Sequence, residues 1–163
     1  MAKYAIRSVK EGVPPEIAEV LRKQEWEESE HQERFEKITG IKAKERDLPP
    51  KMPVQWHACA LRLLGYEALG YEFARIAILE STGPIKEMLE EILLDEEGHV
   101  RFYEEALRKI LTAGGGQAED TRLMARAFLR RLPVTIERYL RGADLAVFQE
   151  SILAGVRLRF ASL

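Results

Sequence analysis

Two copies of a Glu-x-x-His motif, Glu28/His31 and Glu96/His99, bring together the residue types best suited to binding a metal ion. At a spacing of i and i+3, the two side chains lie over adjacent turns of one helix face and can hold one ion. Both motifs lie inside arcs of apolar side chains, where a carboxylate and an imidazole are costly to bury without a partner. The inward-facing arcs include Phe35 and Ile38 in the first copy, joined by Gln24 and Gln32, and Tyr103 in the second. Carboxylates and imidazoles without thiolates suit iron or manganese better than a softer metal.

The two motifs belong to an internal repeat. Moving the chain by 68 residues aligns residues 17–38 with residues 85–106 and places one motif on the other. One such motif alone is more often a core histidine with a local acid partner. Two copies in register, each within an apolar arc, favour metal binding instead. Two facing helices of this kind predict a site for two ions, completed by one bridging carboxylate from each remaining helix.

Three acids on the preceding helix compete to be a bridging carboxylate: Glu67, Glu72 and Glu80. Antiparallel helices meet at equal distances from the turn that joins them, here residues 81–84. Glu67 lies about as far before that turn as the second motif lies after it, whereas Glu80 would miss the site by roughly 20 Å at 1.5 Å per residue. Glu72 is spaced i, i+3 from Arg75, so we expect it to form a local ion pair. We therefore predict Glu67 as the ligand.

An acid precedes each motif, Glu27 in the first copy and Asp95 in the second. Such an acid can reach the Nδ1–H of the opposing histidine and fix its tautomer, as the outer partners of metal ligands do. The alternative, an ordinary solvent-facing acid, is equally compatible with the sequence.

The repeat places the matching carboxylate of the first helix at about position −1, just before Met1. We expect the sequence to begin at an internal methionine, with this glutamate encoded upstream. The alternatives are a site with five protein ligands, or a substitute such as Glu137 or Glu150.

The spacing of apolar residues is helical almost throughout and predicts an all-α fold with short connections between antiparallel neighbours. We expect a ferritin-like four-helix bundle over residues 1–112, with a first helix that is short or truncated. Further arginine-rich helices, over residues 119–163, are expected to pack on it within a single domain. The helices are predicted at 1–10, 15–38, 54–80, 84–112, 119–131 and 133–141, with a last one from Asp144 after Gly142.

The composition, with a net charge of −2 and one cysteine, is that of an ordinary soluble, helix-rich protein and excludes an internal disulfide. No signal peptide or transmembrane run is evident, so we expect a cytoplasmic protein without a nucleic-acid partner. Residues 121–163 hold eight arginines and three acids, a local charge of +5. These arginines are either solvated helix faces or a surface for anionic lipid or another acidic partner.

The ligand pattern Glu28/His31, Glu67 and Glu96/His99 resembles that of the ferritin-like di-iron carboxylate superfamily. The segment "DLPPKMPVQWHACALRLLGYEALGYE" is similar to the entry to the third helix of demethoxyubiquinone hydroxylases, and "DEEGHVRFYEE" is similar to rubrerythrin-type domains. The resemblance covers residues 1–110 and implies an oxidoreductase that activates O2 or peroxide at two iron ions. It further implies an external electron donor and a homo-oligomer.

Three functions follow from these observations. The first is the hydroxylation of an apolar, quinone-like substrate, with the arginine-rich helices at a membrane surface. The second is a rubrerythrin-like peroxide scavenger. The third is a non-catalytic module that binds iron or forms oligomers.

Overall fold

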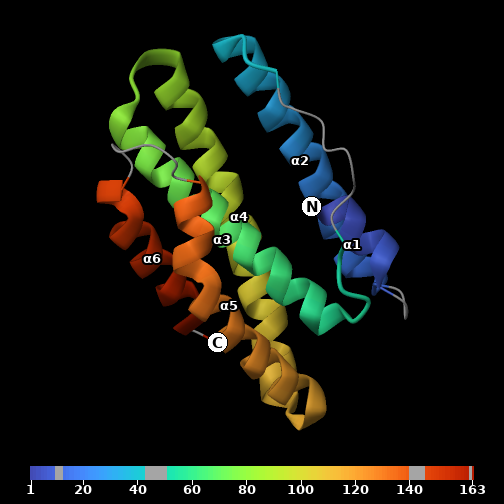
Figure 1. Cartoon of the computed structure of the whole chain (residues 1–163). Helices are drawn as coiled ribbons and strands as arrows, with labels where there is room; N and C mark the ends of the chain where they lie inside the picture. The colour runs from blue at the N-terminus through green and yellow to red at the C-terminus, as the bar shows by residue number, and fades with distance from the viewer. Residues whose placement is uncertain (10–12, 43–50, 140–145, 162) are drawn as a thin grey trace.

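The computed structural model describes residues 1–9, 13–42, 51–139, 146–161 and 163. Every regular element among these residues is an α-helix, so the predicted all-α class is confirmed. No helix in these ranges is both long and apolar enough to cross a membrane. Along the chain (Figure 1) the helices are α1 (Ala2–Ser8), α2 (Pro15–Thr39), α3 (Trp56–Glu80), α4 (Gly83–Ala113), α5 (Gly115–Tyr139) and α6 (Ala146–Ala161).

The helices α3 and α4 form a central antiparallel pair (Figure 1), with α1 and α2 on one side and α5 and α6 on the other. The sequence of α3 explains its central place, because apolar residues occur all round this helix and need neighbours on every face. Accordingly, α3 packs against α4, α5 and α6, while α2 packs against α1 and α4. The two Glu-x-x-His motifs on α2 and α4 therefore face each other across a direct helix contact.

Most of the helix ends lie where the sequence predicts them. Pro15 occupies the first turn of α2, and Gly40 ends that helix with a φ of 69°, which glycine adopts without strain. The predicted break at Pro133 is wrong, because α5 runs continuously from Gly115 to Tyr139. Leu132 and Ile136 are fully buried on either side of the proline, and this packing compensates for the lost backbone hydrogen bond. Gly142 and Asp144 lie outside the described residues.

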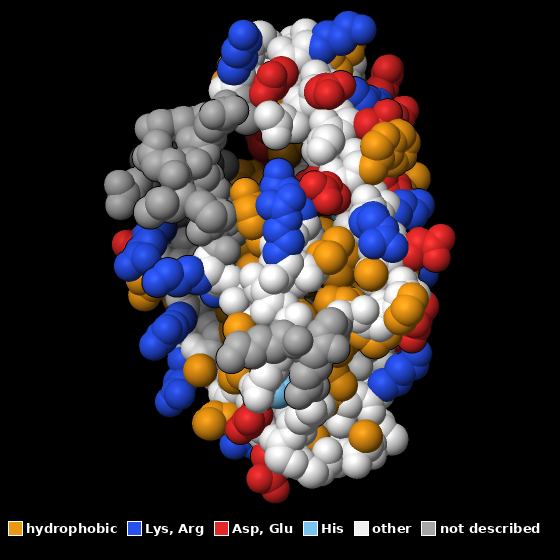
Figure 2. Space-filling model, turned by 90° about the vertical axis from the view of Figure 1, so that its right-hand side faces the viewer, with side chains coloured by type: hydrophobic (Ala, Val, Ile, Leu, Met, Phe, Trp, Pro, Cys, Tyr) orange, Lys and Arg blue, Asp and Glu red, His pale blue; other side chains and the backbone are white. Residues whose placement is uncertain are grey.

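The second half of α2 departs from its predicted burial. Phe35 and Ile38, expected in the apolar arc that faces inward, are 40% and 39% exposed. The reason is the length of α1, because seven residues span only about 10 Å and cannot cover the whole of a 25-residue helix. On this side of the molecule (Figure 2), hydrophobic side chains reach the surface between charged ones.

Two glycines inside helices provide a matched test of the packing. A Cβ on Gly155 in α6 would overlap the buried carboxylate of Glu72 in α3, which is held by Arg75, whereas a Cβ on Gly98 in α4 would meet nothing. We expect Gly155→Ala to lower the free energy of unfolding by about 1–3 kcal/mol through overpacking. We expect Gly98→Ala to raise it by up to about 1 kcal/mol through helix propensity. Urea unfolding of both variants measures the difference, and equal effects would contradict the close approach of α6 to α3.

Candidate metal centre

Four acidic or imidazole side chains from three helices converge in the interior. They are Glu28 of α2, Glu67 of α3, and Glu96 and His99 of α4, and one ligand atom from each lies within 4.8 Å of the others. Three of the four are buried and Glu28 is half-buried. The four belong to the predicted ligand set, and their convergence is the geometry that a metal site requires. Their assignment as ligands stays a prediction.

The structure distinguishes among the three acids of α3. Glu67 lies in the cluster, Glu72 forms the expected ion pair with Arg75 at 2.8 Å, and Glu80 is exposed. Sequence reasoning did not point to Gly70, one turn beyond Glu67. A Cβ on Gly70 would lie 3.4 Å from Oε2 of Glu96, so its absence leaves room for that carboxylate against the backbone of α3.

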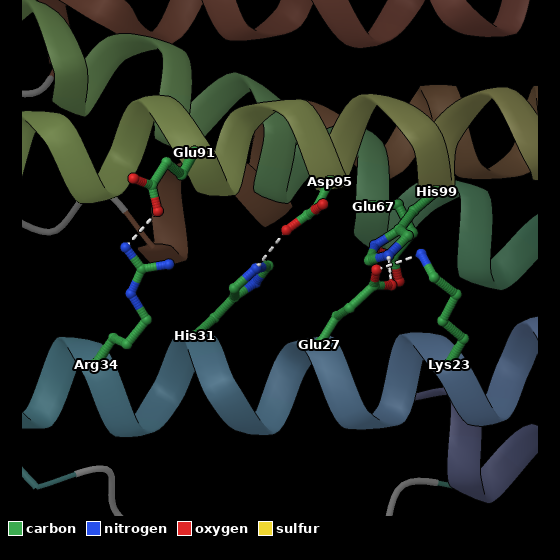
Figure 3. Close-up of polar contacts among 8 residues, drawn as sticks. All are labelled: Lys23, Glu27, His31, Arg34, Glu67, Glu91, Asp95 and His99. Carbon is green, nitrogen blue, oxygen red and sulfur yellow. Dashed lines mark hydrogen bonds and ion pairs between the residues drawn. The ribbon is translucent and has the colours of Figure 1, made fainter.

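Each histidine of the two motifs is held by an acid of the opposite helix. Nε2 of His31 lies 3.0 Å from Oδ2 of Asp95, and Nε2 of His99 lies 3.1 Å from Oε2 of Glu27 (Figure 3). These are the cross-helix pairs that the sequence predicts, but they use Nε2 and not the expected Nδ1. The correction matters because Nε2–H donates to the carboxylate, so Nδ1 is the nitrogen of each ring that is left for a metal ion.

The two Nδ1 atoms are buried and have no hydrogen-bond partner among the described residues. For His99 this atom lies 3.4 Å from Oε2 of Glu67 without forming a hydrogen bond. His31 is buried as well, but it does not belong to the group of four convergent residues. A buried imidazole nitrogen without a partner is costly, and a metal ion would remove that cost.

The clustered carboxylates repel one another. Burial, followed by the charges of Glu67 and Glu28, raises the pKa of Glu96 to about 9. Burial and the charge of Glu67 also raise the pKa of Glu28. A bound dication would reverse both effects, because it favours the ionised form of each carboxylate.

His99 lies in a chain of polar contacts that reaches the surface. Burial alone would lower its pKa, but the contacts with Glu67 and Glu27 raise the pKa of His99 to about 9. Burial alone would raise the pKa of Glu27, but its hydrogen bonds with Lys23 and His99 lower it. Lys23 is exposed and approaches Glu27 from the preceding turn of α2 (Figure 3).

Beyond the charged cluster, Gln24 and Tyr103 form a buried pair, in which the hydroxyl of Tyr103 donates a hydrogen bond to Oε1 of Gln24. Both residues lie on the predicted inward faces of their helices. Gln32 was predicted on the same face, but it is exposed and bonds Glu36. The difference again reflects the uncovered second half of α2.

The two substitutes predicted for a sixth carboxylate do not join the cluster. Glu137 of α5 and Glu150 of α6 are exposed and do not belong to the cluster. Met1 lies near Glu28, since both line a pocket of about 600 Å³ that also contacts His31. A second, smaller pocket of about 310 Å³ lies over the Glu27/His99 pair between α2 and α4.

No protein-family model, curated protein or solved structure matches this chain. The chemistry of the cluster is therefore judged on the donors themselves. Three carboxylates and one imidazole converge, a second imidazole has a buried Nδ1 without a partner, and no thiolate lies in the group. This donor set fits iron or manganese, which accept oxygen and nitrogen ligands together.

Proposed function

We propose that this protein is a di-iron carboxylate oxidoreductase of the ferritin-like kind, in which α1–α4 form the bundle. The observation that carries the proposal is the convergence of Glu28, Glu67, Glu96 and His99 within 4.8 Å. When bound there, two iron ions would supply the activation of O2 or peroxide, and manganese is the alternative metal.

The residues of the chain have distinct tasks in this proposal. Glu67 comes from α3 and lies within 4.8 Å of Glu28 of α2 and of Glu96 and His99 of α4, so it would help to hold the metal. Glu27 and Asp95 accept hydrogen bonds from the Nε2–H groups of the histidines and thereby leave each Nδ1 as the nitrogen that a metal ion would bind in place of a proton. Lys23 neutralises Glu27 at the surface end of this arrangement.

The pocket beside Glu28 and His31 supports the hydroxylation of an apolar substrate. Its walls include the aromatic side chains of Tyr4 and Phe35 and the aliphatic side chain of Ile92. A pocket of about 600 Å³ is within the range of sites for drug-sized molecules. A quinone-like ring could therefore lie directly against two of the proposed ligands.

Two other functions remain as alternatives. A rubrerythrin-like peroxide scavenger would use the same ligands and an external electron donor, but it would not need a pocket of this size. A non-catalytic iron-binding or oligomer-forming module would need only the cluster. A homo-oligomer is compatible with all three proposals.

The metal centre is tested by incubating the protein with ferrous iron under anaerobic conditions and measuring the number of iron ions bound per chain. We expect about two ions per chain, and then consumption of O2 or peroxide when a generic electron donor is supplied. Turnover of peroxide alone would favour the scavenger, and iron binding without turnover would favour the non-catalytic module. Failure to bind iron or manganese would contradict the metal centre itself.

A further inference from the structure

The outward face of α5 carries an unusual concentration of positive charge. Between residues 122 and 138 the helix has five arginines, no lysine and one acid, Glu137. All five guanidinium groups are exposed, and none forms an ion pair with another described residue. These residues are Arg122, Arg126, Arg130, Arg131 and Arg138.

Two apolar side chains lie in the middle of this face. Leu123 and Val134 are 62% and 53% exposed. They are eleven residues apart, about three helical turns, so they lie nearly on one line along α5. At 100° per residue, three of the arginines lie on one side of this line and two on the other. The opposite face of α5 is already buried, with Thr121, Leu132 and Ile136 in the interior.

This combination is suited to the surface of a bilayer. Arginines attract the phosphate groups of anionic lipids, while a leucine and a valine between them can enter the boundary between headgroups and acyl chains. We propose that the outward face of α5 binds the surface of an anionic phospholipid membrane.

Two other occupants fit this face less well. A nucleic acid would satisfy the arginines, but among the side chains of α5 that the structure describes, residues 115–138, the exposed arc has no aromatic ring for base stacking. A nucleic acid would also leave Leu123 and Val134 without an apolar partner. A second copy of the chain, placed across a two-fold axis, would bring two arginine-rich faces together and be repelled.

The position of α5 is compatible with activity at the membrane. The helices α5 and α6 lie on the opposite side of α3 and α4 from α1 and α2 (Figure 1). The pocket beside Glu28 and His31 is lined by Met1, Ile41 and residues of α1, α2 and α4. Binding through α5 would therefore leave this pocket uncovered. The membrane proposal does not depend on the metal centre.

The experiment is cosedimentation of the full chain with vesicles of phosphatidylcholine alone and with vesicles of equal parts phosphatidylcholine and phosphatidylglycerol. We expect binding to the anionic vesicles only, with a steep loss as salt is added. The double variant Arg126→Glu/Arg130→Glu should weaken binding at least about 30-fold, since each basic residue contributes about fivefold. The control Arg22→Glu/Lys37→Glu changes the net charge equally on exposed positions of α2 and should retain binding.

A second pair of variants tests the apolar line. Leu123→Asn/Val134→Asn should weaken binding to the anionic vesicles. The control Leu94→Asn/Val54→Asn changes residues that are also exposed but do not belong to α5, and it should not weaken binding. The proposal is overturned if anionic vesicles are not bound, or if the two charge-reversal variants lose binding equally. It is also overturned if the apolar variant binds vesicles as well as the unchanged chain, because a purely ionic surface would serve any acidic macromolecule.

Discussion

Replacing Glu67 by glutamine is expected to weaken the binding of ferrous iron by at least about 100-fold, more than the loss of a typical outer-shell partner. Glutamine keeps the shape of the side chain but removes a negative charge that the proposed site needs. The same change should stabilise the metal-free protein above pH 9, where Glu96 is ionised and His99 is neutral. The charge of Glu67 then acts against the ionised forms of Glu28 and Glu96 and no longer attracts a protonated His99. A variant that binds metal more weakly but is more stable without metal indicates carboxylates that repel one another until an ion is bound.

Iron content after anaerobic loading and thermal unfolding of the metal-free protein above pH 9 measure the two effects. The matched control is Glu80→Gln, because Glu80 lies on the same helix and is exposed. This control should change neither quantity. If Glu67→Gln destabilises the metal-free protein at that pH and leaves iron binding intact, the cluster is a structural polar network and the proposed metal centre is wrong.

The internal repeat made much of this arrangement predictable. Because the two motifs are in register, Glu27 and Asp95 could each be predicted opposite the histidine of the other copy, and both contacts are present. The distance from the turn at 81–84 was sufficient to place Glu67, and not Glu80, near the second motif. These predictions depend on helix rise and helix period, which are the same in every protein.

The features that the sequence did not reveal depend on tertiary packing. The choice of Nε2 over Nδ1 at His31 and His99 follows from the separation of α2 and α4, which no local pattern encodes. The space that Gly70 leaves for Glu96 and the continuity of α5 through Pro133 likewise depend on neighbouring helices. The exposure of Phe35 follows from the short length of α1, which leaves part of the predicted apolar arc without a partner.

The stability of the metal-free protein is expected to fall as the pH rises. The pKa of Glu96 is raised from 4.5 to about 9, and that of His99 from 6.5 to about 9, so the folded chain retains protons that the unfolded chain has released. For each retained proton, the free energy of unfolding falls by about 1.4 kcal/mol per pH unit. Between pH 6.5 and pH 9 both groups contribute, so the free energy of unfolding should fall most steeply in this interval.

Metal binding should reverse this dependence, because an ion at the cluster displaces the retained protons and its affinity rises as they leave. Thermal unfolding should therefore be measured with and without manganous ion between pH 6.5 and pH 9. We expect the stabilisation of the folded protein by the ion to grow as the pH rises. Titration calorimetry in buffers of different ionisation enthalpy should show the release of about two protons per chain. In the metal-free variant Glu96→Gln the fall in stability with rising pH should be smaller than in the unchanged chain. In Glu80→Gln this fall should be unchanged. A metal-free protein whose stability is constant or increases over this interval would show that Glu96 and His99 are not held in their protonated forms, and that the cluster does not crowd its carboxylates as proposed.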